Sequence, residues 1–139
     1  MVQSVREVMT SGPKTVDAGA PVVDAARIMA DADVGAIVVV DGGQVAGIVT
    51  DRDVTVRAVA KGRDPASTSV REVCSAELTT LTPEDTVDEA VRLMREKAVR
   101  RLPVVEGGRP VGIVSLGDLA VEREPESALG GISAAPPNP

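Results

Sequence analysis

The sequence predicts a mixed α/β protein built from two copies of one small β-α-β-β-α unit. The first observation is an internal repeat: residues 4–54 align without a gap on residues 69–119, and 19 of the 51 aligned pairs are identical. The second is a change of hydrophobic period within each copy, from helical spacing to strand-like runs. The third is a Gly-Gly pair between the two runs of each copy, which favours a tight hairpin.

In each copy a short extended piece precedes the first helix, which is predicted by apolar side chains at positions i, i+3, i+4 and i+7. Charged residues fill the outer face of the second of these helices. The apolar positions are Val22, Ala25, Ala26 and Met29 in the first copy and Val87, Ala90, Val91 and Met94 in the second.

The strand runs follow each helix. Residues 36–40 form a nearly continuous β-branched run, as expected of a strand that is buried on both faces. The equivalent run, residues 102–105, carries a proline, which suits the start or the edge of a strand. After the Gly-Gly turn a second strand returns, and a second helix is expected to begin at Thr50 and at Ser115.

These elements divide the chain into a first repeat at residues 4–60, a polar linker at 61–69 and a second repeat at 70–121. A unit of this size buries too little surface to be stable alone, so we expect the two copies to pack together. The tail, residues 124–139, is rich in Pro, Gly and Ser without apolar periodicity, and we expect it to be disordered.

The composition excludes several classes of function. A net charge of −6 at pH 7 argues against nucleic acid or an anionic membrane as a partner. The chain has no histidine, the commonest metal ligand and general base near neutral pH, and no spacing resembles a nucleophile with its base or a metal cluster. We therefore expect neither an enzyme nor a metal site. Without a signal-peptide pattern or a membrane-length apolar run, we expect a cytoplasmic protein.

The most informative motif is Gly-Ile-Val followed by Thr or Ser and, three residues later, Asp, at residues 47–53 and again at 112–118. Free N–H groups and the positive end of the helix dipole suit a phosphate at such a helix start. An aspartate one turn into the helix can accept hydrogen bonds from two ribose hydroxyls. The same spacing is also an ordinary capping pair, and both roles are compatible if a ligand displaces the cap.

Arg100 and Arg101 are the sharpest difference between the copies, because their equivalents Gly35 and Ala36 carry no charge. A guanidinium group can donate two parallel hydrogen bonds to two oxygens of one phosphate. If these arginines bind phosphate, the two copies offer unequal sites. The alternative is that both are solvated or ion-paired.

Together these residues resemble the tandem CBS-domain (cystathionine-β-synthase-type) proteins, in particular the small stand-alone members, over about residues 4–121. Each matching segment is weak alone, and their order and their duplication at a constant offset make the resemblance specific. The segments that carry it are Val5 to Thr10, Val34 to Ala36, Gly47 to Asp53, Val99 to Val104 and Gly112 to Asp118.

The resemblance implies a Bateman module, in which two β-α-β-β-α repeats pack sheet to sheet about a pseudo-twofold axis and leave two clefts at the junction. In this family the clefts bind adenosine-containing ligands, chiefly AMP, ADP or ATP and in some members S-adenosylmethionine. The modules regulate rather than catalyse and commonly pair as homodimers, so we expect a second copy and an unknown effector protein as partners. No cofactor is implied, and Mg²⁺ is expected only as a counterion of a nucleotide.

Carried over residue by residue, the resemblance implies ribose contacts for Asp53 and Asp118. Phosphate contacts are implied for Thr50, Ser115, Arg100 and Arg101, the two arginines lying at the rim of the cleft. Adenine is expected between aliphatic side chains, because the chain has no aromatic ring for stacking. The positions that the family uses, each of which fits the core equally well, are Val16, Val34, Ile37, Leu81, Val99 and Leu102.

The alternative function is an interaction or dimerisation module that keeps the fold without a ligand. The aliphatic surfaces of the second helices would then contact a partner protein.

Overall fold

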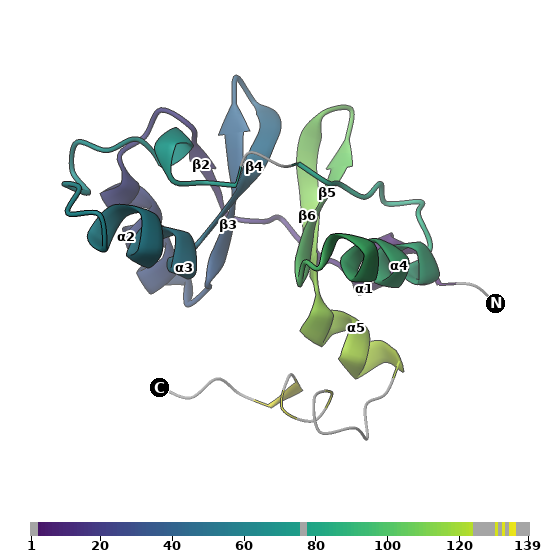
Figure 1. The fold of residues 1–139 in the computed structure, drawn as a ribbon. Coiled ribbons are helices and arrows are strands. Elements are labelled where there is room, and N and C mark those ends of the chain that lie inside the picture. The colour runs from purple at the N-terminus through teal and green to yellow at the C-terminus, as the bar shows by residue number, and fades with distance from the viewer. Residues whose placement is uncertain (1–2, 76–77, 124–129, 131, 133, 136–139) are drawn as a thin grey trace. The chain divides into compact units, whose positions relative to one another are not determined.

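The structure is a computed structural model, and it confirms a mixed α/β fold with two three-stranded sheets and flanking helices (Figure 1). It describes residues 3–75, 78–123, 130, 132 and 134–135. Most of the tail that we expected to be disordered therefore lies outside the described residues.

The first copy follows the predicted order of elements, with one additional short strand, β1. The elements that the structure describes there are α1 (Val5–Val8), β1 (Thr10–Ser11), β2 (Thr15–Asp17), α2 (Val22–Ala32), β3 (Ala36–Asp41), β4 (Gln44–Thr50), α3 (Asp51–Asp53) and a π-helical segment, η1 (Val54–Val59).

The second copy differs from the prediction in one element. It contains a 3₁₀ turn, η2 (Val70–Glu72), then α4 (Val87–Lys97), β5 (Arg101–Glu106), β6 (Arg109–Ser115) and α5 (Leu116–Arg123). The extended piece expected before α4 is reduced to an isolated parallel bridge between Leu81 and Val104. The same register forms a full strand pair in the first copy, where Val16 lies opposite Val39.

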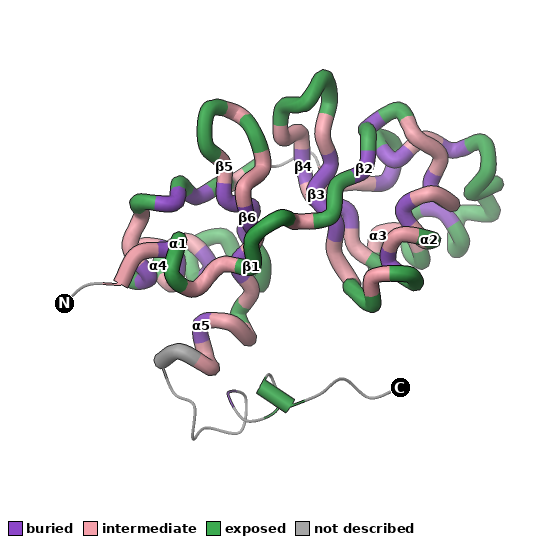
Figure 2. The backbone as a smooth tube through the Cα atoms, turned by 180° about the vertical axis from the view of Figure 1, so that it is seen from behind, coloured by how far each residue is buried: buried purple, intermediate pink, exposed green. Residues whose placement is uncertain are grey.

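The sheet of the first copy has the order β2-β3-β4, with β3 in the centre. Ile37, Val38 and Val39 of β3 are buried, as the β-branched run predicted. Figure 2 colours the backbone by burial and marks the position of β3. Gly42 and Gly43 form the predicted turn to β4, and both have positive φ, at 60° and 82°. The antiparallel pairing of β3 with β4 ends where Ala36 lies opposite Thr50.

Helices α2 and α4 bury the faces that the spacing predicted. Val22, Ala25 and Met29 lie in one hydrophobic core, and the equivalent residues of α4 lie in a second core. Thr86 caps α4, its Oγ1 accepting a hydrogen bond from the Glu89 N–H at 3.1 Å.

The opening segments, residues 4–11 and 69–75, are exchanged between the two compact units. One unit comprises residues 1–12, 80–106 and 111–139, and the other comprises residues 13–79 and 107–110. Each unit thus joins the body of one copy to the opening segment of the other. The compact units therefore do not coincide with the repeats read along the sequence.

The exchange is held by buried valines and by backbone hydrogen bonds. Val5 is fully buried in the core that contains α4, and Val70 is fully buried in the core that contains α2. The Val5 N–H donates to Asp85 O at 2.7 Å, and the Val70 N–H donates to Ala20 O at 2.8 Å. The two bonds join equivalent positions of the repeat, offset by 65 residues, so the opening segment is attached in the same way in both units.

Each opening segment also has its own capping box. The Ser69 N–H donates to Glu72 Oε2 at 2.8 Å, and the Ser4 N–H donates to Glu7 Oε2 at the same distance. The hydrogen bonds from the Ser69 backbone and hydroxyl lower the pKa of Glu72 below its ordinary value. This cap is therefore complete above the ordinary pKa of a glutamate and is lost as the pH falls through the lowered pKa.

Two glycines let the opening segments cross the second strand of each copy. A β-carbon on Gly47 would lie 2.7 Å from Ser75 O, and a β-carbon on Gly112 would collide with the Met9 sulfur. Thr10 pairs with Ile113, beside Gly112, in the antiparallel ladder of β1 and β6. A side chain on Gly47 would push the opening segment away, because the obstructing atom is a backbone oxygen, whereas a side chain on Gly112 would first displace the flexible Met9 side chain.

Gly47→Ala is therefore expected to lower the free energy of unfolding by about 1–3 kcal/mol, the usual range for overpacking a tight contact. Gly19→Ala is a matched control, because its β-carbon would meet only the Asp17 carboxylate at 3.4 Å. Urea denaturation followed by circular dichroism measures both variants. An equal loss of stability in the two variants would contradict a close crossing at Gly47.

Candidate ligand site at the strand-to-helix junctions

The two second helices begin with the same reciprocal cap. The Thr50 N–H donates to Asp53 Oδ2 at 2.9 Å, and the Asp53 N–H donates to Thr50 Oγ1 at 3.1 Å. In the second copy the Ser115 N–H donates to Asp118 Oδ2 at 2.9 Å, and the Asp118 N–H donates to Ser115 Oγ at 3.0 Å. The capping interpretation of the repeated motif is confirmed in both copies.

The strand before each cap fixes its position. Thr50 is the last residue of β4 and has extended dihedral angles, φ −116° and ψ 164°. The preceding Val49 is fully buried, so the junction is anchored in the core. Asp53 lies one turn into the helix with a side chain that is only 16% exposed. Its carboxylate is therefore held in one orientation at the edge of the core.

Each cap occupies a carboxylate and a backbone N–H that could otherwise bind a ligand. At each junction the N–H of Thr50 or Ser115 donates to the aspartate carboxylate. A hydrogen bond to a charged group contributes about 1.5–3 kcal/mol. A ligand can displace the cap only if its own groups replace these hydrogen bonds.

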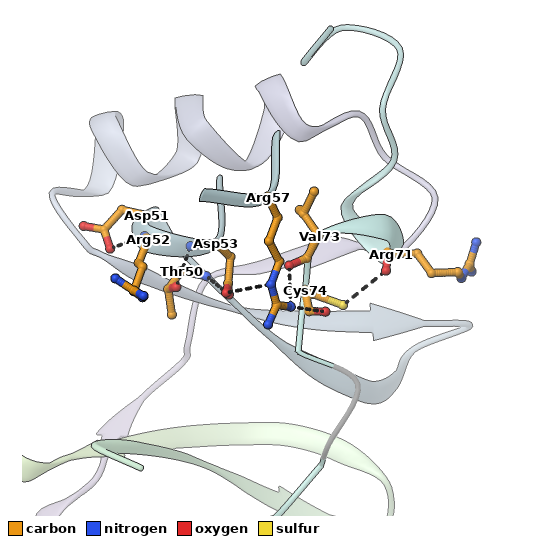
Figure 3. A network of polar contacts seen from close by, with 8 residues as sticks. All are labelled: Thr50, Asp51, Arg52, Asp53, Arg57, Arg71, Val73 and Cys74. Atoms are coloured by element: carbon orange, nitrogen blue, oxygen red, sulfur yellow. Dashed lines mark hydrogen bonds and ion pairs between the residues drawn. The ribbon is translucent and has the colours of Figure 1, made fainter. Parts of the chain in front are cut away.

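Arg57 connects the first of these caps to the opening segment of the second copy (Figure 3). Its Nη1 donates to Val73 O at 3.1 Å and to Cys74 O at 3.2 Å, and its Nε lies 4.0 Å from Asp53 Oδ1. Its equivalent, Glu122, is a carboxylate and cannot donate such bonds. Arg57 was not among the predicted site residues, because its hydrogen bonds go to carbonyls of a distant segment, although the change from Arg to Glu between copies was a usable signal.

Arg57 lies in η1, where the helix is wider than an α-helix. The Ala60 N–H donates to Thr55 O and the Arg63 N–H to Ala58 O, five residues back in each case. Such π-helical turns are rare and occur frequently at functional sites. The equivalent helix α5 is α-helical, so the copies differ at this helix in winding as well as in charge.

In the second copy the two predicted arginines lie beside the cap. Arg100 O accepts a hydrogen bond from the Leu116 N–H at 2.8 Å, which fixes the Arg100 backbone against the first turn of α5. Arg101 is the first residue of β5, the neighbour of the strand that ends at Ser115. Both side chains are exposed, and neither forms an ion pair with any residue that the structure describes.

The equivalent place in the first copy is acidic. Gly35 O accepts from the Asp51 N–H at 3.0 Å, in the same arrangement as Arg100 and Leu116. The Asp51 carboxylate covers Gly35, with Oδ2 3.1 Å from the point that a β-carbon there would occupy. The two junctions therefore share backbone geometry and differ in the sign of the charge beside it.

The six aliphatic positions suggested for adenine fall into two groups. Four are buried members of the two cores: Val16 and Ile37 in one, Leu81 and Leu102 in the other. Val34 and Val99 are exposed, at 38% and 36%. Each copy thus offers one exposed aliphatic side chain from this set.

Cys74 has the character of a packing residue. Burial raises the pKa of its thiol, and the negative charge of Asp53 adds to the effect. The thiol therefore stays protonated at neutral pH and is a poor nucleophile. Among the described residues, no three His, Cys, Asp or Glu side chains come together as a metal site, and no helix is long and apolar enough to cross a membrane.

Comparison with known proteins places these features in a family. The model of the CBS domain matches residues 5–59 and 70–123. The CBS domain-containing protein YhcV of Bacillus subtilis is 41% identical over 129 residues, which are 93% of this chain and 91% of that protein.

Solved structures agree with this match. A protein with CBS domains from Burkholderia ambifaria superposes with a TM-score of 0.78 at 34% identity, covering 90% of this chain and 96% of that one. A hexameric CBS-CP12 protein from bloom-forming cyanobacteria gives a TM-score of 0.78 at 29% identity, covering 92% and 77%. The matches span both copies of the repeat, and the chain belongs to the family of proteins that carry two CBS domains in tandem.

Proposed function

We propose that this CBS pair is a regulatory module that binds an adenosine-containing ligand, such as AMP, ADP, ATP or S-adenosylmethionine, at its capped strand-to-helix junctions. The observation that supports the proposal is the cap itself, which pairs a hydroxyl residue with a half-buried aspartate at two equivalent places. Regulation is the general role of CBS pairs, and the ligand is our inference.

In this proposal the ligand binds by replacing the hydrogen bonds of the cap. When Asp118 turns from the Ser115 N–H to two ribose hydroxyls, that N–H and the Ser115 hydroxyl become donors for a phosphate at the helix start. The same exchange applies to Thr50 and Asp53. The exposed Val34 and Val99 then supply an apolar contact for the base.

The second copy is the stronger site for an anion. Arg100 and Arg101 lie beside Ser115 without ion-pair partners in the described part of the chain, whereas Asp51 lies beside Thr50. We infer that the second copy fills first and that ligands with more phosphates prefer it.

The alternative role as an interaction module has its own support. Val56 and Val59 on η1 are 41% and 62% exposed, and Leu116 on α5 is 40% exposed. A hexamer is known for the cyanobacterial relative. Association with a second copy or with an effector protein is therefore compatible with ligand binding. We place both roles in the cytoplasm, where adenine nucleotides are available.

Adenosine ligands are expected to raise the melting temperature of the protein, because a ligand that binds only the folded state stabilises it by about 2.7 kcal/mol at 100 times its Kd. Differential scanning fluorimetry with AMP, ADP, ATP and S-adenosylmethionine measures the shift. CMP is the control, since it shares the ribose phosphate but lacks adenine. If none of the four adenosine ligands changes the melting temperature, the interaction module becomes the better explanation.

Asp118→Ala is expected to weaken binding of the preferred nucleotide by about 1–3 kcal/mol through the loss of its ribose hydrogen bonds. Isothermal titration calorimetry measures the affinity. Thr86→Ala is a matched control, because it removes a similar cap at α4, away from the proposed site. Unchanged affinity in Asp118→Ala would remove this residue from the site, and an equal loss in Thr86→Ala would trace the effect to stability.

A further inference from the structure

An apolar pocket opens in the compact unit that contains the body of the second copy, between the end of α4 and the first turns of α5. Helix α4 ends at Ala98, whose left-handed backbone, with φ 54°, turns the chain toward β5. The Val99 N–H donates to Met94 O at 3.1 Å. On the other side, the Leu116 N–H donates to Arg100 O at 2.8 Å. The backbone therefore fixes the shape of the pocket.

The pocket has room for two aliphatic side chains. Its volume is about 420 Å³, whereas a cavity of about 150 Å³ between apolar side chains already holds a benzene molecule. Val99 and Leu116 are 36% and 40% exposed, so part of the apolar wall faces solvent. The residues that line the pocket are Val91, Met94, Arg95, Ala98, Val99, Arg100, Leu116 and Leu119.

Cations surround this pocket. Residues 95–101 hold four cationic side chains and one carboxylate, a formal charge of +3. The four cations are exposed and form no ion pair with any residue that the structure describes. Two of them, Arg95 and Arg100, line the pocket itself. The surface therefore suits an occupant that combines aliphatic groups with negative charge.

The segment of the chain that follows α5 has this combination. Residues 124–132 read Glu-Pro-Glu-Ser-Ala-Leu-Gly-Gly-Ile, with two carboxylates and no cation. Its large apolar residues are Leu129 and Ile132. Ile132 is 73% exposed, the highest value for a large apolar side chain among the described residues. The fold thus leaves in water a side chain that the pocket could bury.

The segment is long enough to reach the pocket. Leu119 lines the pocket, and α5 continues for four more residues, to Arg123. Four helical residues rise about 6 Å, whereas the nine residues 124–132 can span up to about 30 Å. A segment joined by so short a connection has an effective concentration of the order of millimolar at its site. Even a contact too weak to hold a separate peptide would therefore be populated.

We propose that residues 124–132 fold back on α5 and occupy this pocket. Leu129 and Ile132 enter it, and the carboxylates of Glu124 and Glu126 lie beside the cations of the rim. The composition of the tail predicts disorder, and segments that are disordered alone can become ordered on a binding surface.

The first copy offers no equivalent place for the segment. Residues 30–36 contain two aspartates and no cation, a formal charge of −2, and the position of Leu116 is taken by Asp51. The two carboxylates of the segment would be repelled there, because like charges oppose contact. Charge therefore selects the pocket of the second copy, the copy to which the segment is joined.

The proposal goes beyond ligand binding and does not rest on it. Val99 and Arg100 belong both to the pocket and to the proposed ligand site, so a docked segment and a nucleotide compete for them. A protein that binds no nucleotide could still bind its own segment. The experiment is therefore carried out without nucleotide.

The experiment is NMR spectroscopy of the full chain with labelled methyl groups on Ile, Leu and Met. The chain has only four methionines, which makes the Met94 signal easy to identify. Nuclear Overhauser effects are expected between the Ile132 methyl groups and those of Met94 and Leu119. In a mixture of Ile-labelled chains with Leu- and Met-labelled chains these effects are expected to vanish, because the contact lies within one chain.

Glu124→Lys/Glu126→Lys is expected to weaken these effects at least about twofold, since like charges then meet at the rim. Asp31→Lys/Asp33→Lys is the matched control, because it makes the same change in net charge at exposed positions of the first copy. It is expected to leave the effects unchanged.

Three results would each overturn the proposal: no effect between Ile132 and the pocket in the wild type, effects that persist in the mixture and so make a second copy the occupant, or effects of equal strength in Glu124→Lys/Glu126→Lys. Circular dichroism of each variant confirms that the chains compared are folded. Nucleotide titrations of the wild type test the ligand site separately.

Discussion

The exchange of opening segments is the constraint on which the rest of this structure depends. Val5 and Val70 are fully buried in the core of the opposite copy, so neither core is complete without a segment that lies far away in the sequence. The backbone of each segment is fixed by hydrogen bonds just before α2 or α4, and its far end crosses the second strand at Gly47 or Gly112. Each opening segment therefore contacts the body of the opposite copy at two places, before its first helix and at its last strand.

On this framework the two copies have kept one backbone and diverged in charge. The caps at Thr50 and Ser115 have matching hydrogen bonds, and the helix starts are tied to Gly35 and Arg100 in the same way. The surrounding side chains then give one copy an acidic and the other a basic surface. A duplicated unit can in this way carry two junctions with the same hydrogen bonds and opposite neighbouring charges.

The sequence was a good guide to whatever is encoded locally. The helices α2 and α4, the Gly-Gly turns and the helix starts after Thr50 and Ser115 were predicted, because spacing and turn chemistry act over a few residues. The exchange was not predicted, because the bond from Val5 to Asp85 leaves no local pattern. The Arg57 contacts were not predicted for the same reason. The caps were foreseen as one of two interpretations, and their ligand role stays a prediction, since hydrogen-bonding capacity alone does not identify a ligand.

The exchanged segments also bear on how such a protein can be divided. A cut within residues 61–69 would give two fragments of similar length. The first would lack Val70, which fills its core, and the second would lack Val5. Each would instead carry an opening segment with no core to bury it. Neither fragment would have the complete hydrophobic core that its repeat has in the full chain. Because each core needs the opening segment of the other copy, the two repeats of this chain form one cooperative folding unit that can be transferred to another protein only as a pair.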